Sequence, residues 1–334
     1  MSVVQPGLQG RLVKVAEGNI GSPRISGDGS TVVWNQMVDG QLEVMRWKNG
    51  QVECLSKDPR PDMHADVSDD GDTVVWTRHS NENPTQGGSW DVVMWKNGEL
   101  RTIAADPVAN EFTCRISRDG NTVVYDSDTN GKWGFWHIEK WRDGQTERVT
   151  EGFPGTSQEF PFVSGDGQRV FWREYAKGDS DIWMRDQNKV IKPVVATDSE
   201  QVTPQISPDG CKLVWSDDRL GDSDVLMTDL DHGNQVRVVS GERKADETWA
   251  TMSADGSVVA WTHFDRSDEE QTRVNIYVRR GDEDPTQVTV EDGGLNSWPQ
   301  VSDDGTRLAW QWQDRENWRN SVLYLLEMDP EPAR

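Results

Sequence analysis

The side chains best suited to chemistry recur at one position of a phrase that the chain repeats seven times. Six residues before the serine that opens the phrase stand Ile20, Asp62, Glu111, Gln158, Gln201, Glu247 and Asn296. Carboxylate and amide oxygens are ligands for hard divalent cations, and neighbouring carboxylates can share a proton. Asp62, Glu111 and Glu247 are therefore candidate metal ligands, and a divalent cation is a candidate cofactor.

Two further matched positions hold aromatic, basic and acidic side chains. Four residues before each serine stand Ser22, His64, Thr113, Phe160, Thr203, Trp249 and Trp298. Two residues after the aromatic that ends each phrase stand Gln36, Arg78, Ser127, Glu174, Asp217, His263 and Trp312. Aromatic rings bind sugar faces or peptide side chains, and the polar groups beside them supply directional hydrogen bonds.

These sets give the predicted ligand-binding residues: Trp249, Trp298, Trp312, His263, Phe160, His64, Arg78, Glu174 and Asp217. The alternative is a water-filled channel whose polar lining satisfies only its own backbone ends. Both interpretations require that the seven repeats bring matched positions together around one centre.

The repeated phrase is Ser-x-Asp-Gly-x-x-apolar-x-aromatic. Its copies are 26–34, 68–76, 117–125, 164–172, 207–215, 253–261 and 302–310. The serines lie 42 to 49 residues apart, which is the period of a four-stranded propeller blade. The sequence thus predicts an all-β fold, a seven-bladed β-propeller of four-stranded antiparallel blades. We expect one domain over 1–334, with repeats at about 19–56, 57–104, 105–150, 151–196, 197–240, 241–290 and 291–328.

The fifth repeat shows how each blade is built from four strands, called A to D in chain order. Residues 202–207, 212–216, 224–228 and 235–239 alternate apolar and polar side chains, with a tight Pro-Asp-Gly turn between the first two. Regular alternation along strand A places positions two, four and six before the serine toward the central channel. The D–A and B–C loops then share one face, and their lengths vary most.

The ends of the chain predict how the ring closes. After Trp310 only one further strand, 321–327, precedes the Pro-containing tail, so the last blade lacks its strand D. Residues 11–16 have the strand D pattern and come before the first strand A. We expect them to complete the last blade, a three-plus-one closure that leaves no exposed central edge.

Composition limits the partners. The net charge of −23 repels phosphate backbones and anionic headgroups, so neither nucleic acid nor membrane insertion is expected. The first residues lack the basic and apolar stretches of a signal peptide, which predicts a cytoplasmic protein unless a leader has been removed. The three cysteines are odd in number and lack metal-ligand spacing, which argues against both a disulfide framework and a zinc site.

A second candidate cation site lies after the third phrase. Asp126, Asp128 and Asn130 match the first half of a calcium-binding loop with oxygen ligands at alternate positions. The twelfth position is His137 rather than the bidentate Glu of such loops. An ordinary polar turn between strands is the competing interpretation.

The repeat resembles that of TolB-like propellers. The resemblance rests on the Ser-x-Asp-Gly phrase, on the segment 214–225, and on a proline three residues before the serine in four copies: Pro23, Pro161, Pro204 and Pro299. It covers essentially the whole chain and implies the propeller fold. The family includes partner-binding scaffolds and enzyme-gating domains, so it does not specify an activity. Propeller polysaccharide lyases of related type use several histidines on a metal, whereas here only His64, His79 and His263 are expected near that face, in the second and sixth repeats, too dispersed for one metal.

Two functions are compatible with these residues. The first is a non-enzymatic binding scaffold that docks a protein, peptide or glycan on the face of the D–A and B–C loops. The alternative is a metal-assisted polysaccharide lyase or hydrolase at the channel mouth. No Gly-x-Ser-x-Gly elbow, His-Glu-x-x-His helix or phosphate-binding glycine loop occurs in the chain.

Overall fold

The structure is a computed structural model that describes residues 4–5, 10–128, 135–151, 155–176, 178–219, 221–232, 235–241, 244–268, 272–290 and 293–328. These residues form 28 strands and one short 3₁₀-helix, Pro84–Gln86. No helix in the described ranges has the length and apolar character needed to cross a membrane. The fold is all-β, as predicted.

The strands group into antiparallel sheets of four that follow the sequence repeats. The first three sheets are β2 (Arg24–Ile25), β3 (Thr31–Val38), β4 (Gln41–Lys48) and β5 (Gln51–Cys54); β6 (Asp62–Val67), β7 (Thr73–His79), β8 (Trp90–Lys96) and β9 (Glu99–Ala104); and β10 (Glu111–Ile116), β11 (Thr122–Asp128), β12 (Trp136–Arg142) and β13 (Gln145–Arg148). The next two are β14 (Thr156–Val163), β15 (Val170–Ala176), β16 (Asp179–Arg185) and β17 (Ile191–Val195); and β18 (Gln201–Ile206), β19 (Lys212–Asp217), β20 (Asp224–Asp229) and β21 (Arg237–Ser240).

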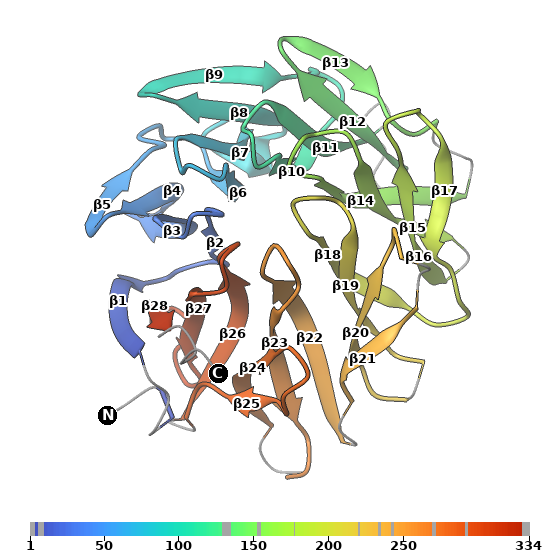
Figure 1. The fold of residues 1–334 in the computed structure, drawn as a ribbon. Helices are drawn as coiled ribbons and strands as arrows, with labels where there is room; N and C mark the ends of the chain where they lie inside the picture. The colour runs from blue at the N-terminus through green and yellow to red at the C-terminus, as the bar shows by residue number, and fades with distance from the viewer. Residues whose placement is uncertain are drawn as a thin grey trace.

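The last two repeats share one larger sheet. It contains β22 (Ala245–Met252), β23 (Val258–Asp265), β24 (Arg273–Arg280), β25 (Thr286–Gln287), β26 (Gly294–Val301), β27 (Arg307–Asp314), β28 (Ser321–Met328) and β1 (Gly10–Gly18). A single parallel bridge, Val274 with Leu295, joins its two halves. Figure 1 shows the sheets arranged around a common centre, with the first strand of each repeat innermost, which is the arrangement of a β-propeller.

The N-terminal strand closes the ring. β1 pairs antiparallel with β28 from Gly10 opposite Met328 to Gly18 opposite Ser321. In Figure 1 the blue β1 and the red β28 lie side by side. The prediction that residues near the N-terminus supply the outer strand of the last repeat is confirmed.

The repeated phrase forms the A–B turn. In the fifth repeat the Ser207 hydroxyl donates to Asp209, and the Lys212 backbone N–H donates back to the Ser207 oxygen at 2.8 Å. Gly210 has φ +73°, a conformation that glycine adopts without a steric cost. The aspartates of the phrase therefore hold turns, as predicted.

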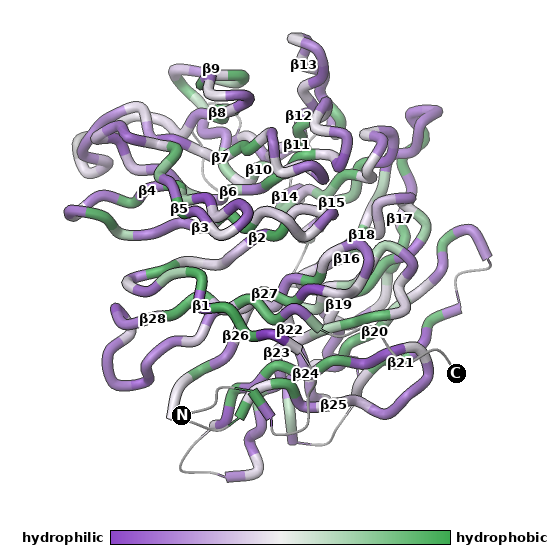
Figure 2. The backbone as a smooth tube through the Cα atoms, turned by 60° about the vertical axis from the view of Figure 1, so that its left-hand side comes forward, coloured by the Kyte–Doolittle hydropathy of each residue, from purple (hydrophilic) through white to green (hydrophobic). Residues whose placement is uncertain are grey.

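The core lies between neighbouring sheets. The aromatic that ends each phrase is fully buried on the second strand: Trp34, Trp76, Tyr125, Trp172, Trp215, Trp261 and Trp310. Valine and other branched side chains pack beside these rings in clusters that lie between neighbouring repeats. Figure 2 shows apolar residues concentrated along the strands, while most connections are polar.

Six of the seven inner strands contain a β-bulge that the sequence did not reveal. In β6 the pairing shifts between Met63 and Asp66, and corresponding shifts occur in β10, β14, β18, β22 and β26. A bulge adds one residue to a strand and re-aims the side chains on either side of it. The extra residue falls near position four before the serine, so positions six and two no longer share a face.

Candidate binding site in the central channel

Positions six before the serine and two after the aromatic lie opposite each other on strands A and B. The pairs are Ile20 with Gln36, Asp62 with Arg78, Glu111 with Ser127, Gln158 with Glu174, Gln201 with Asp217, Glu247 with His263 and Asn296 with Trp312. Every residue of the six-before set is at most 4 % exposed. The bulge therefore turns these side chains into the sheet-to-sheet interior.

Several of these polar groups bond to the buried tryptophans. Trp76 Nε1 donates to Asp62 Oδ1 at 2.5 Å, and Arg78 Nε donates to the same oxygen at 2.7 Å. Trp310 Nε1 donates to Asn296 Oδ1 at 3.1 Å. A buried indole N–H needs such an acceptor, so Asp62 and Asn296 satisfy hydrogen-bond donors of the core.

The prediction that these side chains point into the central channel is therefore wrong. Asp62, Glu111, Glu247, Arg78, Asp217 and His263 are buried and line neither channel cavity. His263 Nδ1 lies 3.1 Å from Glu247 Oε1, and Arg219 pairs with Asp217. Glu174 and Trp312 are partly buried, and they too lie outside the cavity linings.

The histidines and acids do not form a metal centre in the part of the chain that the structure describes. No three His, Cys, Asp or Glu side chains there lie close enough to hold one ion. His79 Nδ1 contacts the backbone of Asn81, and His64 packs edge-on against Phe112 at 4.5 Å. The donor set expected of a histidine-bound metal is therefore absent from the described residues.

The calcium-like segment has another role. Asp126 and Asp128 belong to strand β11, and their oxygens accept backbone N–H groups from Thr113, Phe160 and Asn110 at 2.6 to 3.1 Å. Burial raises the pKa of Asp126 to about 7. Asn130 lies outside the described residues. These contacts correct the calcium-loop interpretation, because the carboxylate oxygens already accept amide N–H groups from β10, β14 and the segment before β10.

A cavity of about 310 Å³ lies at the level of position four before the serine, toward the B–C and D–A loops. Phe160, Trp249 and Trp298 from three inner strands line it. The two indole rings are 5.4 Å apart, and Trp249 also contacts Phe264 at 5.6 Å. The structure thus brings together three of the aromatic residues predicted to bind ligand.

The aromatic residues of this cavity have unusual backbones. Phe160, Trp249 and Trp298 have φ of +52°, +53° and +55°, as His64 and Thr203 do at the matched position. Bulky side chains rarely adopt this left-handed region, and such residues cluster at functional sites. Asp126 stabilises one of them, because its Oδ2 accepts the Phe160 N–H at 3.1 Å. Arg173 lies over the Phe160 ring at 4.7 Å and pairs with Glu159 at 3.3 Å.

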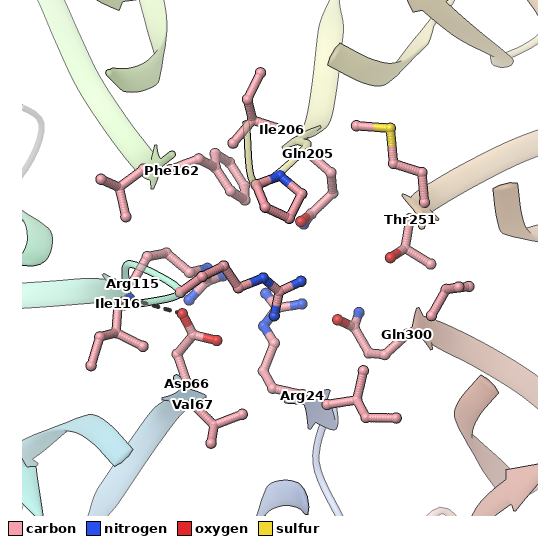
Figure 3. Close-up of a pocket in the computed structure, with 16 residues that line it drawn as sticks. Arg24, Asp66, Val67, Arg115, Ile116, Phe162, Gln205, Ile206, Thr251 and Gln300 are labelled. Carbon is pink, nitrogen blue, oxygen red and sulfur yellow. Dashed lines mark hydrogen bonds between the residues drawn. The ribbon is translucent and has the colours of Figure 1, made fainter. Parts of the chain in front are cut away.

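A second, narrower cavity of about 80 Å³ continues the channel below the first. It is lined by the residue two before the serine in all seven repeats: Arg24, Asp66, Arg115, Phe162, Gln205, Thr251 and Gln300. Figure 3 shows Arg24 and Arg115 extending toward the centre of this ring, with Asp66 beside them. Both arginines also line the upper cavity, so the two spaces are continuous.

Sequence reasoning missed these arginines. Position two was expected to face the channel, and reading its seven residues side by side would have shown two arginines and one aspartate. The predicted metal ligands and most of the predicted aromatic ligand-binding residues came instead from positions four and six, where acidic and aromatic side chains are more numerous.

The far end of the channel is constricted by the A–B turns. Backbone hydrogen bonds join successive turns, including Asp303 N–H to Gly27 O at 2.8 Å and Asp69 N–H to Arg118 O at 2.9 Å. Arg118 Nη2 donates to Asp303 Oδ1 at 2.6 Å. This ion pair joins the third and seventh repeats across the channel end, so a ligand has freer access from the loop face.

The channel electrostatics are set by its arginines. Burial and the neighbouring Arg115 lower the pKa of Arg24. Burial, with Arg115 and Arg24 nearby, lowers the pKa of His64 to about 4, so this imidazole is neutral at pH 7. A chain of net charge −23 thus has a locally positive channel.

The comparisons with known proteins support the fold. No family model matches the chain, and no curated protein matches it in sequence. Oligogalacturonate lyase from Vibrio parahaemolyticus is similar in structure, with a TM-score of 0.69 and 12 % identity over 97 % of this chain and 99 % of that one. TolB from Acinetobacter baumannii gives a TM-score of 0.54 and 14 % identity over 90 % and 80 % of the two chains. The β-propeller domain of Myceliophteria thermophila Cps50 (Swd1) gives 0.66 and 11 % over 96 % and 100 %. The chain therefore has a TolB-like β-propeller fold, a likeness that defines no activity.

Proposed function

We propose that this chain is a single-domain, seven-bladed β-propeller that acts as a binding module for a protein, peptide or glycan. The 28 strands fit seven blades of four. The partner docks on the face of the D–A and B–C loops and inserts part of itself between Phe160, Trp249 and Trp298. The observation that carries the proposal is the convergence of these three strained aromatic residues on one cavity.

Exposed apolar side chains on the same face support docking. Met37 and Tyr175 lie at the loop ends of β3 and β15, and Phe135 and Trp318 lie in B–C connections. Each is between 41 % and 59 % exposed. Aromatic residues and methionine are enriched in the contact regions of protein interfaces. Two proteins of similar fold, TolB and the β-propeller domain of Cps50, are not named as enzymes, which is consistent with a binding role.

The enzymatic alternative, a metal-assisted polysaccharide lyase or hydrolase, has less support. Its best argument is the similarity in fold to oligogalacturonate lyase. The acids proposed for its metal, Asp62, Glu111 and Glu247, are buried within their own repeats, and among the described residues no three His, Cys, Asp or Glu side chains lie close enough to hold one ion. The aromatic cavity therefore supports a binding function better than the buried acids support a metal-assisted reaction.

A combined peptide and glycan array tests the proposal. We expect wild-type protein to bind a defined subset of ligands, and Trp249→Ala and Trp298→Ala to lose that binding. Leu100→Ala is the control, because Leu100 is exposed on the outer strand β9 near the C–D turn, away from the loop face, and lines neither cavity. Binding that both channel variants retain would remove the aromatic cavity from the function.

A further inference from the structure

We propose that the channel binds the free C-terminal carboxylate of a peptide chain through Arg24 and Arg115. The inference rests on the proposed function, because the chain end would enter through the cavity between Phe160, Trp249 and Trp298. It adds the chemical class of the ligand and two residues to that site.

Arg24 is the channel residue best placed to bind an external anion. Its side chain extends from β2 into the channel and is partly buried, and no hydrogen bond or ion pair joins it to any of the described residues. A cation that loses part of its hydration without gaining a partner is destabilising, and a bound anion would offset that loss. Burial and the repulsion from Arg115 lower the pKa of Arg24, and an anion placed between the two arginines would offset that repulsion.

Arg115 has unused donors at the same level. Its Nη1 donates to the Cys114 carbonyl at 2.8 Å, but its buried Nε has no hydrogen-bond partner. Phe162 holds the guanidinium by a cation–π contact at 5.6 Å. Arginine binds carboxylates through paired N–H donors, so Arg24 and Arg115 together form a suitable cradle.

The charge balance selects a monoanion. The charged residues that line the two cavities are Arg24, Asp66, Arg115, Arg118 and Arg173. Asp303 neutralises Arg118, and Glu159 neutralises Arg173. Asp66 offsets one of the two remaining arginines, which leaves one positive charge in the channel. One carboxylate matches that charge, whereas the strongly negative chain repels a polyanion.

The shape of the channel selects a chain end. The A–B turns constrict its far side, so an extended polymer has no clear path through it. The upper cavity of about 310 Å³ is at the small end of the usual range for ligand sites, about 300–1,000 Å³. It suits the last residue or two of a peptide, with an apolar side chain against the indole rings and the carboxylate deeper in the channel. Every unmodified polypeptide supplies such a terminus.

The test uses two pooled hexapeptide libraries that differ only in having a free or an amidated C-terminus. We expect immobilised wild-type protein to retain members of the free-acid library about tenfold or more over their amides. Arg24→Gln and Arg115→Gln should each weaken binding of the retained peptides by about tenfold to a hundredfold. Arg237→Gln is the matched control, because it removes the same charge from the outer strand β21, where Arg237 pairs with Asp282.

The outcomes separate this inference from the proposed function. Equal retention of acid and amide peptides, lost in Trp298→Ala, would overturn the carboxylate site and leave the binding function intact. Retention of neither library would overturn the peptide-terminus inference. If uronic-acid oligosaccharides bound in an Arg24-dependent manner instead, the ligand would be an acidic glycan and the peptide assignment would be wrong. Carboxylate binding that depends on Arg24 but not on Trp249 or Trp298 would contradict the aromatic cavity instead.

A stability measurement supplies a readout that needs no ligand. If Arg24 serves ligand binding, Arg24→Met should raise the melting temperature, because it removes an unpaired, partly buried charge and its repulsion with Arg115. A lowered melting temperature would show that Arg24 stabilises the fold, and would overturn its assignment to ligand binding.

Discussion

Trp249 and Trp298 occupy the same position of neighbouring inner strands, with ring centroids 5.4 Å apart and planes inclined at 56°. Both residues have left-handed backbones, which costs roughly 1–2 kcal/mol for a residue with a side chain. The paired strands around them sustain that conformation. The two indoles are thereby held toward the channel rather than in the sheet-to-sheet core.

This relationship predicts that Trp249 contributes little to stability. Trp249→Gly removes packing but also relieves the left-handed strain, so we expect the free energy of unfolding to change by about 1 kcal/mol or less. Trp261→Ala on the adjacent β23 should cost about 3–5 kcal/mol, because Trp261 is fully buried. Urea unfolding of both variants measures the difference. Equal losses would place Trp249 in the core.

The buried Asp62–Arg78 pair should be strongly coupled. Asp62→Leu leaves the buried Arg78 with only the longer contact to Asp58 at 3.5 Å, and Arg78→Met leaves the Asp62 carboxylate without its cation, so each should cost about 3–5 kcal/mol. The double variant removes both charges and should cost much less than the sum. Chemical denaturation of the four proteins gives the coupling energy, and additive losses would contradict a structural ion pair.

Glu111 makes stability depend on pH. Burial raises the pKa of Glu111 to about 8 from an ordinary 4.5, so the folded state favours the protonated acid. Its contribution to stability is present below about pH 4.5 and is lost as the pH rises through 8, a loss on the order of 5 kcal/mol. Glu111→Gln should remove this part of the slope of melting temperature against pH between 4.5 and 9, whereas Glu99→Gln on the exposed edge strand should keep it. A slope unchanged in Glu111→Gln would refute the assignment.

Deletion of residues 1–18 should lower the melting temperature strongly. The deletion removes the whole of β1 and leaves the outer edge of β28 unpaired. Leu12→Ser is a useful control, because Leu12 is exposed on the same strand and its loss should have little effect. An unchanged melting temperature after the deletion would mean that β1 does not close the ring.

The sequence predicted the fold better than the site. The seven Ser-x-Asp-Gly phrases and the aromatic residue that ends each of them predicted the order of the strands. The strand D pattern of residues 11–16 predicted that the N-terminal strand closes the ring. Asp62 and Glu247 were placed at the channel mouth because regular alternation was assumed along strand A. The bulge breaks that alternation, and no residue type marks it: position four carries Ser, His, Thr, Phe or Trp, and never Gly. The same assumption placed Trp249 and Trp298 toward the channel, and the structure leaves them there because position four lies at the bulge itself.

The central claim is that ligand occupies the channel between Phe160, Trp249 and Trp298. Calorimetric titration of the best array ligand into wild type, the Trp249→Ala/Trp298→Ala double variant and Leu100→Ala tests it most directly. We predict at least a tenfold loss of affinity in the double variant, since each aromatic contact contributes about 0.5–1.5 kcal/mol beyond its buried area, and unchanged affinity in Leu100→Ala. Equal affinity in the wild type and the double variant would contradict the account.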